Sequence, residues 1–365
     1  MIPSGTCCCF RCGKLFYADQ IAFYDSLNNH LWAAHDGSYT AVNRSTGSDV
    51  DVSTKKIQVI KSKGVPDQLN VEDTSTNRSL RIHTNVCPFC KQELQDKAGR
   101  YPTYTFLMTG LPGVGKTAFG EYTTSQAGQQ FVRQLGLSVS SGGKLGGARL
   151  EATQVGSSKL FNILVSDGKN TSMINFFDVS GELYSNRRFA DNVIEDGFYE
   201  LRQILANMGN ALDGCIAMMD SRNLAPQFQR FAVEFALNDA ETAIDEFLQW
   251  LKDERKDFPI LYVFNKSDQL KGTVTRDNAA ITTSSLLFKN AALSKRALAT
   301  HIALAQKFIL NCCCSAATAN DPCFVIQLGN PGPDNTLYFN EAKNAALPFV
   351  FLLHRFKLCP KNLPD

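Results

Sequence analysis

The sequence predicts an α/β fold: a doubly wound, mainly parallel sheet in residues 101–365, preceded by a small zinc-binding, β-rich domain in residues 1–100. Two observations lead to this prediction. From Tyr104 onward, apolar runs alternate with longer amphipathic segments, which is typical of βα units around a parallel sheet. Before that point, paired cysteines and polar, turn-rich stretches surround short β-like runs. We place the boundary near residues 97–102.

The apolar runs and amphipathic segments define the elements that we expect. In the N-terminal domain, short strands are expected at 56–60 and 80–83. In the larger domain, strands are expected at 105–108, 160–165, 173–177, 215–219, 260–264 and 323–327, with a hairpin turn at 167–170. Helices are expected at 117–134, 191–206, 226–254, 285–310 and 340–356. In the third helix, apolar residues recur at helical spacing and predict a face that covers the sheet: Ile244, Phe247, Leu248 and Leu251.

The composition and charge of the chain favour an ordinary globular protein over a nucleic-acid-binding or membrane-spanning one. The chain is 44% hydrophobic and 20% charged with a net charge of +2, which is typical of an ordinary globular protein and argues against nucleic acid as a partner. The first twenty residues contain no apolar signal segment, and the apolar run 347–353 is too short to span a bilayer. We therefore expect a cytoplasmic protein without a membrane span. Its twelve cysteines should stay reduced, which favours metal binding or burial over disulfides.

A glycine-rich loop follows the first predicted strand of the larger domain. Residues 110–117 read G-L-P-G-V-G-K-T and match G-x-x-x-x-G-K-[ST], the P-loop pattern. Glycines allow successive N–H groups to converge on phosphate oxygens, the lysine contributes a charge, and the threonine hydroxyl is a Mg²⁺ ligand. Because a buried strand precedes the loop and a helix follows it, we expect a nucleotide-phosphate site. Its predicted residues are Gly110, Gly113, Val114, Gly115, Lys116, Thr117 and Ala118.

The run Asn265-Lys266-Ser267-Asp268 comes directly after another buried strand. A carboxylate at Asp268 can accept two hydrogen bonds from the N1–H and the exocyclic amine of guanine, whereas adenine has no such donor pair. Asn265 can bridge toward the base and the P-loop, and the aliphatic stem of Lys266 can lie across the ring. This pattern predicts a guanine-reading loop.

A third polar motif lies between these two. The apolar run at 173–177 delivers Asp178 to the carboxyl end of a strand, and the letters D-V-S-G place Gly181 three residues later. Asp178 is suited to hold Mg²⁺, and the backbone N–H of Gly181 can contact a γ-phosphate. The segment after Gly181 is therefore expected to respond to the nucleotide state.

The three motifs, in this order, resemble the TRAFAC-class (translation-factor-related) P-loop GTPases, which include Ras-like proteins. The resemblance covers roughly residues 104–356 and implies GTP or GDP with Mg²⁺ as ligands. It also implies a Mg²⁺-binding threonine ahead of the second strand. Thr153 stands at a suitable distance, with Ser157 and Ser158 as competitors. The loop behind the base is either 326–329, with Gln327 and Leu328, or 315–317; we favour the former.

One position departs from the family pattern. Many of these GTPases carry a glutamine after D-x-x-G to orient the attacking water, and this chain has Glu182. A negative charge beside a triphosphate is unfavourable unless it is offset, so we expect Mg²⁺-dependent but slow GTP hydrolysis, with Lys116, Gly181 and Glu182 as the catalytic candidates. Arg187 and Arg188 are candidates for charge compensation, although surface arginines more often pair with carboxylates.

Two C-x-x-C knuckles lie in the N-terminal domain, Cys9 with Cys12 and Cys87 with Cys90. Four thiolates satisfy the tetrahedral demand of a structural Zn²⁺. The insert between the knuckles is long for a zinc ribbon, and separate buried thiols are the competing interpretation. Alternative ligands are Cys7, Cys8 and His83.

A zinc ribbon ahead of such a GTPase domain resembles bacterial double-GTPase proteins of conflict and defence systems, which implies a GTPase or effector protein as partner. The leading hypothesis is therefore a GTP-hydrolysing switch. The alternatives are a zinc-ribbon adaptor that uses nucleotide as a structural ligand and a P-loop ATPase, against which Asp268 argues.

Overall fold

The structure is a computed structural model in which the chain forms two compact units. Unit 1 contains Met1–Tyr104 and Tyr199–Leu212, and unit 2 contains Thr105–Phe198 and Asp213–Asp365. The second segment of unit 1, which interrupts unit 2 in the sequence, was not anticipated from the sequence. The structure describes residues 1–35, 38–140, 148–149, 158–181, 193–221, 237–255, 257–267, 273–276, 279–282, 295–309, 321–329, 336–337, 339 and 342–359.

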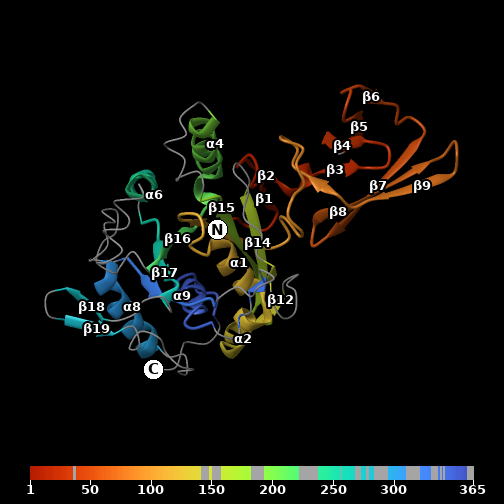
Figure 1. The fold of residues 1–365 in the computed structure, drawn as a ribbon. Coiled ribbons are helices and arrows are strands. Elements are labelled where there is room, and N and C mark those ends of the chain that lie inside the picture. Colours follow the sequence, from red (N-terminus) through yellow and green to blue (C-terminus); the bar gives the residue numbers. More distant parts are fainter. Residues whose placement is uncertain are drawn as a thin grey trace. The chain divides into compact units, whose positions relative to one another are not determined.

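Unit 1 is rich in short antiparallel strands (Figure 1). Strands β1 (Thr6–Cys8) and β2 (Leu15–Tyr17) form a hairpin around the first knuckle. A five-stranded sheet follows the order β10-β3-β4-β5-β6, and a three-stranded sheet follows the order β7-β8-β9. The bounds are β3 Ala22–Asp25, β4 His30–His35, β5 Ser38–Asn43, β6 Asp49–Val50, β7 Lys55–Ser62, β8 Val65–Asp73, β9 Arg78–Ile82 and β10 Asn85–Val86. The expected strands at 56–60 and 80–83 correspond to β7 and β9.

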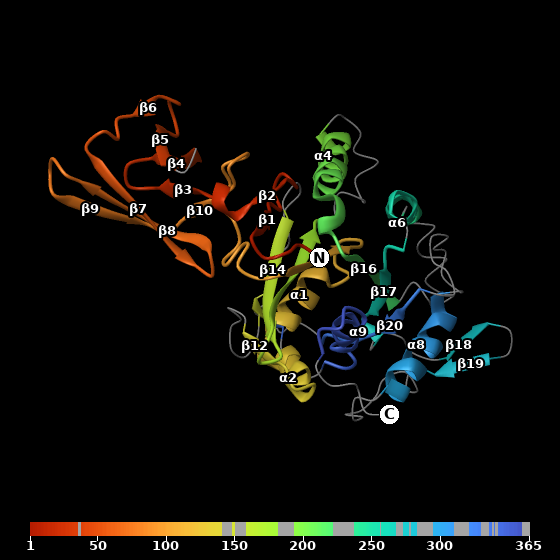
Figure 2. The same cartoon turned by 180° about the vertical axis from the view of Figure 1, so that it is seen from behind.

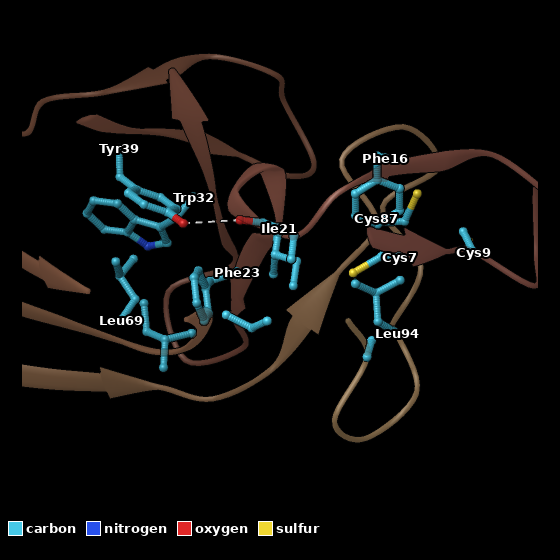
Figure 3. Packing of buried hydrophobic residues seen from close by; sticks show 14 of the residues in the cluster. Cys7, Cys9, Phe16, Ile21, Phe23, Trp32, Tyr39, Leu69, Cys87 and Leu94 are labelled. Carbon is cyan, nitrogen blue, oxygen red and sulfur yellow. Dashed lines mark hydrogen bonds between the residues drawn. The ribbon is translucent and has the colours of Figure 1, made fainter. Parts of the chain in front are cut away.

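One hydrophobic cluster joins the sheets of unit 1 to the cysteine knuckles (Figure 3). At the end of the cluster that lies in the sheets, Trp32 and Phe23 are fully buried. At the end that lies in the knuckles, Cys87 is fully buried. Between them, the Tyr39 hydroxyl donates to the carbonyl of Ile21 at 3.2 Å. Because the cluster is continuous, the knuckles are part of the core of unit 1.

Unit 2 is built on a large mixed sheet of mostly parallel strands, as the sequence predicted. Its order is β12-β14-β15-β11-β16-β17-β20. Figure 2 labels β12, β14, β16, β17 and β20 of this sheet. The pairs β11–β16, β16–β17 and β17–β20 are parallel, whereas β12–β14 and β14–β15 are antiparallel. The bounds are β11 Thr103–Thr109, β12 Ser138–Ser140, β14 Ser158–Ser166, β15 Thr171–Val179, β16 Gly214–Asp220, β17 Ile260–Asn265 and β20 Cys323–Val325. The expected hairpin turn at 167–170 joins β14 to β15, with Asp167 N–H bonded to the carbonyl of Asn170.

Helices pack on this sheet through aromatic contacts. Phe176 of β15 contacts both Phe119 of α1 and Phe349 of α9, so these two helices lie on the same side of β15. In α6, the predicted apolar residues Ile244, Phe247, Leu248 and Leu251 are buried. The helices are α1 Lys116–Thr124, α2 Gln126–Gln134, α4 Val193–Met208, α6 Leu237–Glu254, α8 Lys295–Ile309 and α9 Leu347–Arg355. Short two- and four-residue strands form two further pairs: β13 Ala148–Arg149 with β21 Thr336–Leu337, and β18 Thr273–Arg276 with β19 Ala279–Thr282.

The prediction of one helix over 117–134 is wrong, because the chain breaks at Ser125. The backbone of Ser125 is extended, and its hydroxyl accepts a hydrogen bond from the N–H of Gly128 at 3.2 Å, which caps the second helix. The last expected helix is also shorter than predicted and begins at Leu347. None of the helices in the described part of the chain combines the length and the apolar character needed to cross a bilayer.

Candidate functional site

The glycine-rich loop connects β11 to α1. Gly110 and Gly113 lie in the turn, Val114 is buried, and Ala118 is buried in the first turn of α1. Gly115 has φ +101°, and a Cβ there would lie 2.3 Å from Nδ2 of Asn265. A glycine is therefore needed at this point, both for its backbone conformation and for the close approach of the β17 end.

Lys116, at the start of α1, is 6% exposed and turns its ammonium group into the loop. Its Nζ donates to the carbonyls of Gly110 at 2.7 Å and Leu111 at 3.0 Å. The next residue, Thr117, donates its hydroxyl to Oδ2 of Asp178 at 2.7 Å. Asp178 lies at the end of β15 and is fully buried, so the structure brings the two proposed Mg²⁺ ligands together from positions 61 residues apart.

Gly181 brings the chain after β15 against the same loop. A Cβ on Gly181 would lie 2.5 Å from the carbonyl carbon of Leu111 and from the nitrogen of Pro112. The backbone of the D-x-x-G motif therefore packs directly on the glycine-rich loop, at the side where Lys116 is bonded.

Asn265 joins the end of β17 to this loop. Its Nδ2 donates to the carbonyl of Val114 at 3.0 Å. Leu328, just beyond β20, lies near the same point, since its Cδ1 would be 3.6 Å from a Cβ on Gly115. The backbone of the Ser267 turn also bonds to the β20 end, with Ser267 N–H donating to the carbonyl of Ile326 at 3.3 Å. The two segments predicted to surround a base are therefore neighbours.

Several buried polar atoms at or just after the carboxyl ends of β16, β17 and β20 lack a hydrogen-bond partner among the described residues. They are Ser221 Oγ, Asn265 Oδ1, Ser267 Oγ and Gln327 Oε1. Leaving such atoms unsatisfied is costly, so their concentration at three adjacent strand ends is what a site for a polar ligand requires. The donor and acceptor set fits a nucleobase, and the glycine-lined loop beside it fits phosphates.

Some predicted site residues lie outside the part of the chain that the structure describes: Thr153, Ser157, Glu182, Arg187, Arg188, Asp268 and residues 315–317. Ser158 is described and lies at the start of β14, paired with Val179. Sequence reasoning missed Asp220 and Ser221, although the buried run before them ends at a strand terminus like those of β15 and β17. The same rule applied to β16 would have found them.

The four knuckle cysteines form one cluster. The sulfur atoms of Cys9, Cys12, Cys87 and Cys90 all lie within 4.8 Å of one another. Cys9 and Cys90 are separated by 3.5 Å, and Cys12 and Cys87 by 3.9 Å. Zinc at 2.3 Å from four tetrahedral sulfurs would hold them about 3.8 Å apart, so this cluster can bind a metal such as zinc.

The two knuckles share one backbone design. The residue after each second cysteine has positive φ, +73° at Gly13 and +61° at Lys91, and donates its N–H to the carbonyl of the first cysteine. A hydrogen bond from the Cys9 thiol, with N–H groups of the second knuckle, lowers the pKa of Cys87 to about 5. This shift favours the thiolate form of Cys87, which is the form that binds metals.

The alternative ligands do not belong to this cluster. Cys7 and Cys8 are buried on β1, and burial raises the pKa of each thiol to about 12. The sulfur of Cys8 points to the carbonyl of Gly13 at 3.8 Å instead. His83 is exposed just after β9. Among the described residues, the C-x-x-C pairs alone make up the candidate metal site.

Within unit 1, the first knuckle packs against the second half of α4. Nδ2 of Asn207 donates to the carbonyl of Cys12 at 2.9 Å. At Gly13, an added Cβ would lie 2.1 Å from the carbonyl oxygen of Ile204 and 2.9 Å from Cβ of Asn207. Glycine is thus required here by both its left-handed backbone and the contact with the helix.

We expect Gly13→Ala to destabilise unit 1 by about 2–5 kcal/mol, which combines a left-handed backbone penalty of ~1–2 kcal/mol with overpacking of ~1–3 kcal/mol. The chain has two tryptophans, Trp32 in unit 1 and Trp250 in unit 2, so denaturant unfolding followed by fluorescence in a Trp250→Phe background reports unit 1. Gly5→Ala is the matched control, since Gly5 has φ +83° and open space around its Cβ position. Equal losses in both variants would show that the α4 contact contributes nothing.

A scan against protein families and a search of curated proteins each found no match to this chain.

Proposed function

We propose that this protein is a guanine-nucleotide-binding switch that hydrolyses GTP slowly with Mg²⁺. One observation carries the proposal: the ends of β11, β15 and β17 bring the three sequence motifs to one place. Two hydrogen bonds support it, one from Thr117 to Asp178 and one from Asn265 to Val114. The packing of Gly181 on the loop supports it as well. Ligands of doubly wound sheets bind at the carboxyl ends of the strands, where this set lies.

Each residue has a task in this proposal. The N–H groups of the loop and Lys116 bind the phosphates, and Thr117 with Asp178 holds Mg²⁺, which would neutralise phosphate charge. Asn265, Lys266 and Asp268 bind guanine, with Gln327 and Leu328 behind the base. The backbone N–H of Gly181 would contact the γ-phosphate, which is the group that distinguishes GTP from GDP. Glu182 keeps hydrolysis slow because its charge opposes that of the triphosphate.

The cysteine cluster supports a structural role for zinc in unit 1. All four sulfurs are contributed by the chain, which leaves no open coordination position for a substrate. A GTPase or effector protein as the partner of the switch is the part of the proposal that rests on the family resemblance alone.

The proposal is tested by comparing GTP, GDP and ATP affinities in the presence of Mg²⁺, followed by phosphate release under multiple turnover. We expect Asp268→Ala to weaken GTP and GDP binding by about 100-fold or more, since two charge-assisted hydrogen bonds are lost at ~1.5–3 kcal/mol each. The affinity for pyrophosphate, which has no base, should stay unchanged and is the internal control.

Other outcomes separate the alternatives. Equal affinities for ATP and GTP in the unmutated protein would overturn the guanine assignment. Tight GTP binding without phosphate release would remove the enzymatic part and favour an adaptor that uses nucleotide as a structural ligand.

A further inference from the structure

The end of β16 carries a buried carboxylate beside the proposed base site. Asp220 is the last residue of β16 and is 6% exposed. In the parallel pair of β16 with β17, it stands opposite Asn265. Its Oδ2 accepts a hydrogen bond from Nζ of Lys266 at 2.9 Å. An acidic side chain is thus placed one strand away from the base-reading loop and is bonded to its lysine.

The side chain of Lys266 has a defined position only if its ammonium group is bound. Its φ is +62°, a conformation that side-chain-bearing residues rarely adopt, and its side chain remains 26% exposed. A lysine has four rotatable bonds, so its stem forms a defined surface only where its ammonium group is held. The Asp220 carboxylate, whose side chain is 9% exposed, provides that hold from a neighbouring strand of the same sheet.

We propose that Asp220 is a positioning residue: it holds the ammonium group of Lys266 so that the aliphatic stem forms one wall of the guanine pocket. This inference rests on the proposed nucleotide-binding function. Asp220 acts through Lys266, whereas Mg²⁺ is assigned to Thr117 and Asp178 at the β15 side of the loop. Through Lys266, its replacement is expected to weaken the binding of the base to the same extent in GDP and GTP.

The test is a double-mutant cycle with Asp220→Asn, Lys266→Met and the double variant, measured by calorimetric titration of the full chain with GDP, GTP and pyrophosphate. Asp220→Asn should weaken GDP and GTP binding equally, by about 10-fold, the loss of one charge-assisted bond. Pyrophosphate affinity should not change. In the Lys266→Met background, which retains an apolar stem without the charge, Asp220→Asn should have less than a 2-fold effect.

Asp321→Asn is the matched control. Asp321 forms a similarly buried ion pair with Lys252 at 2.7 Å. Because it comes just before β20, it lies at the amino ends of the parallel strands, whereas the proposed base site lies at their carboxyl ends. Its replacement should leave GDP affinity unchanged. A purely structural role for Asp220 would lower stability in denaturant and weaken GDP and pyrophosphate alike, and this result would overturn the inference. Unchanged GDP affinity would also overturn it. Failure of the unmutated protein to bind GDP would instead overturn the proposed function.

Discussion

Lys116→Ala is expected to weaken GTP and GDP binding by about 30-fold or more. Truncating one partner of a buried charge pair costs about 2–5 kcal/mol, and each 1.4 kcal/mol corresponds to a tenfold change in affinity. Lys116 is the buried cation in the loop, and the loop carbonyls of Gly110 and Leu111 already hold its ammonium group in place. Calorimetric titration with GDP and Mg²⁺ measures the effect.

The control is Lys159→Ala. Lys159 also lies near α1, where it forms an ion pair with Glu121 at 2.8 Å, but its side chain is 38% exposed. Exposed pairs contribute about 0–1 kcal/mol, so this variant should bind GDP like the unmutated protein. If Lys116→Ala retained full affinity while it remained folded, the glycine-rich loop would not be a phosphate site.

Cys87→Ser is expected to remove the bound metal and unfold unit 1. Structural zinc contributes apparent binding free energies of about 10–16 kcal/mol, which is comparable to the ~5–15 kcal/mol that stabilises a whole domain. Cys87 is fully buried in the same cluster as Trp32, so loss of the metal should disrupt the core around that tryptophan (Figure 3). Elemental analysis and Trp32 fluorescence in the Trp250→Phe background measure the two effects.

Cys8→Ser is the control, because it replaces a buried cysteine that lies outside the metal cluster. Cys8 lies on β1 outside the cluster, and its thiol points to the carbonyl of Gly13, a bond that a serine hydroxyl can also make. This variant should retain one zinc per chain and the native fluorescence. Zinc retained in Cys87→Ser at full occupancy would contradict the four-cysteine site.

The parts of the fold that were predictable are those encoded by local pattern. The strands before the glycine-rich loop and before Asn265 are centred on apolar runs, and these runs are buried as expected. The gathering of Thr117, Asp178 and Asn265 followed from the rule that parallel strands share a carboxyl edge. The two cysteine knuckles were identified from spacing, because sulfur ligands two residues apart suit a metal.

Other features depend on signals that are weak or non-local. The break at Ser125 depends on one side-chain cap, which helical periodicity over 117–134 obscured. The end of β16 was read only as an apolar run, so Asp220 and its bond to Lys266 were missed. The membership of Tyr199–Leu212 in unit 1 has no local signature, since it depends on Gly13 and Cys12, nearly two hundred residues earlier.

That discontinuity determines the order in which unit 1 can be completed during synthesis. Both cysteine pairs leave the ribosome within the first ninety residues, so the candidate metal site is complete in sequence early. The helix that Gly13 and Cys12 contact emerges only about 95 residues after Tyr104, a delay of about 5–20 s at ordinary translation rates. Until then the surface of the first knuckle is uncovered. Unit 1 therefore stays incomplete until a helix encoded within the sequence of the other unit has been synthesised.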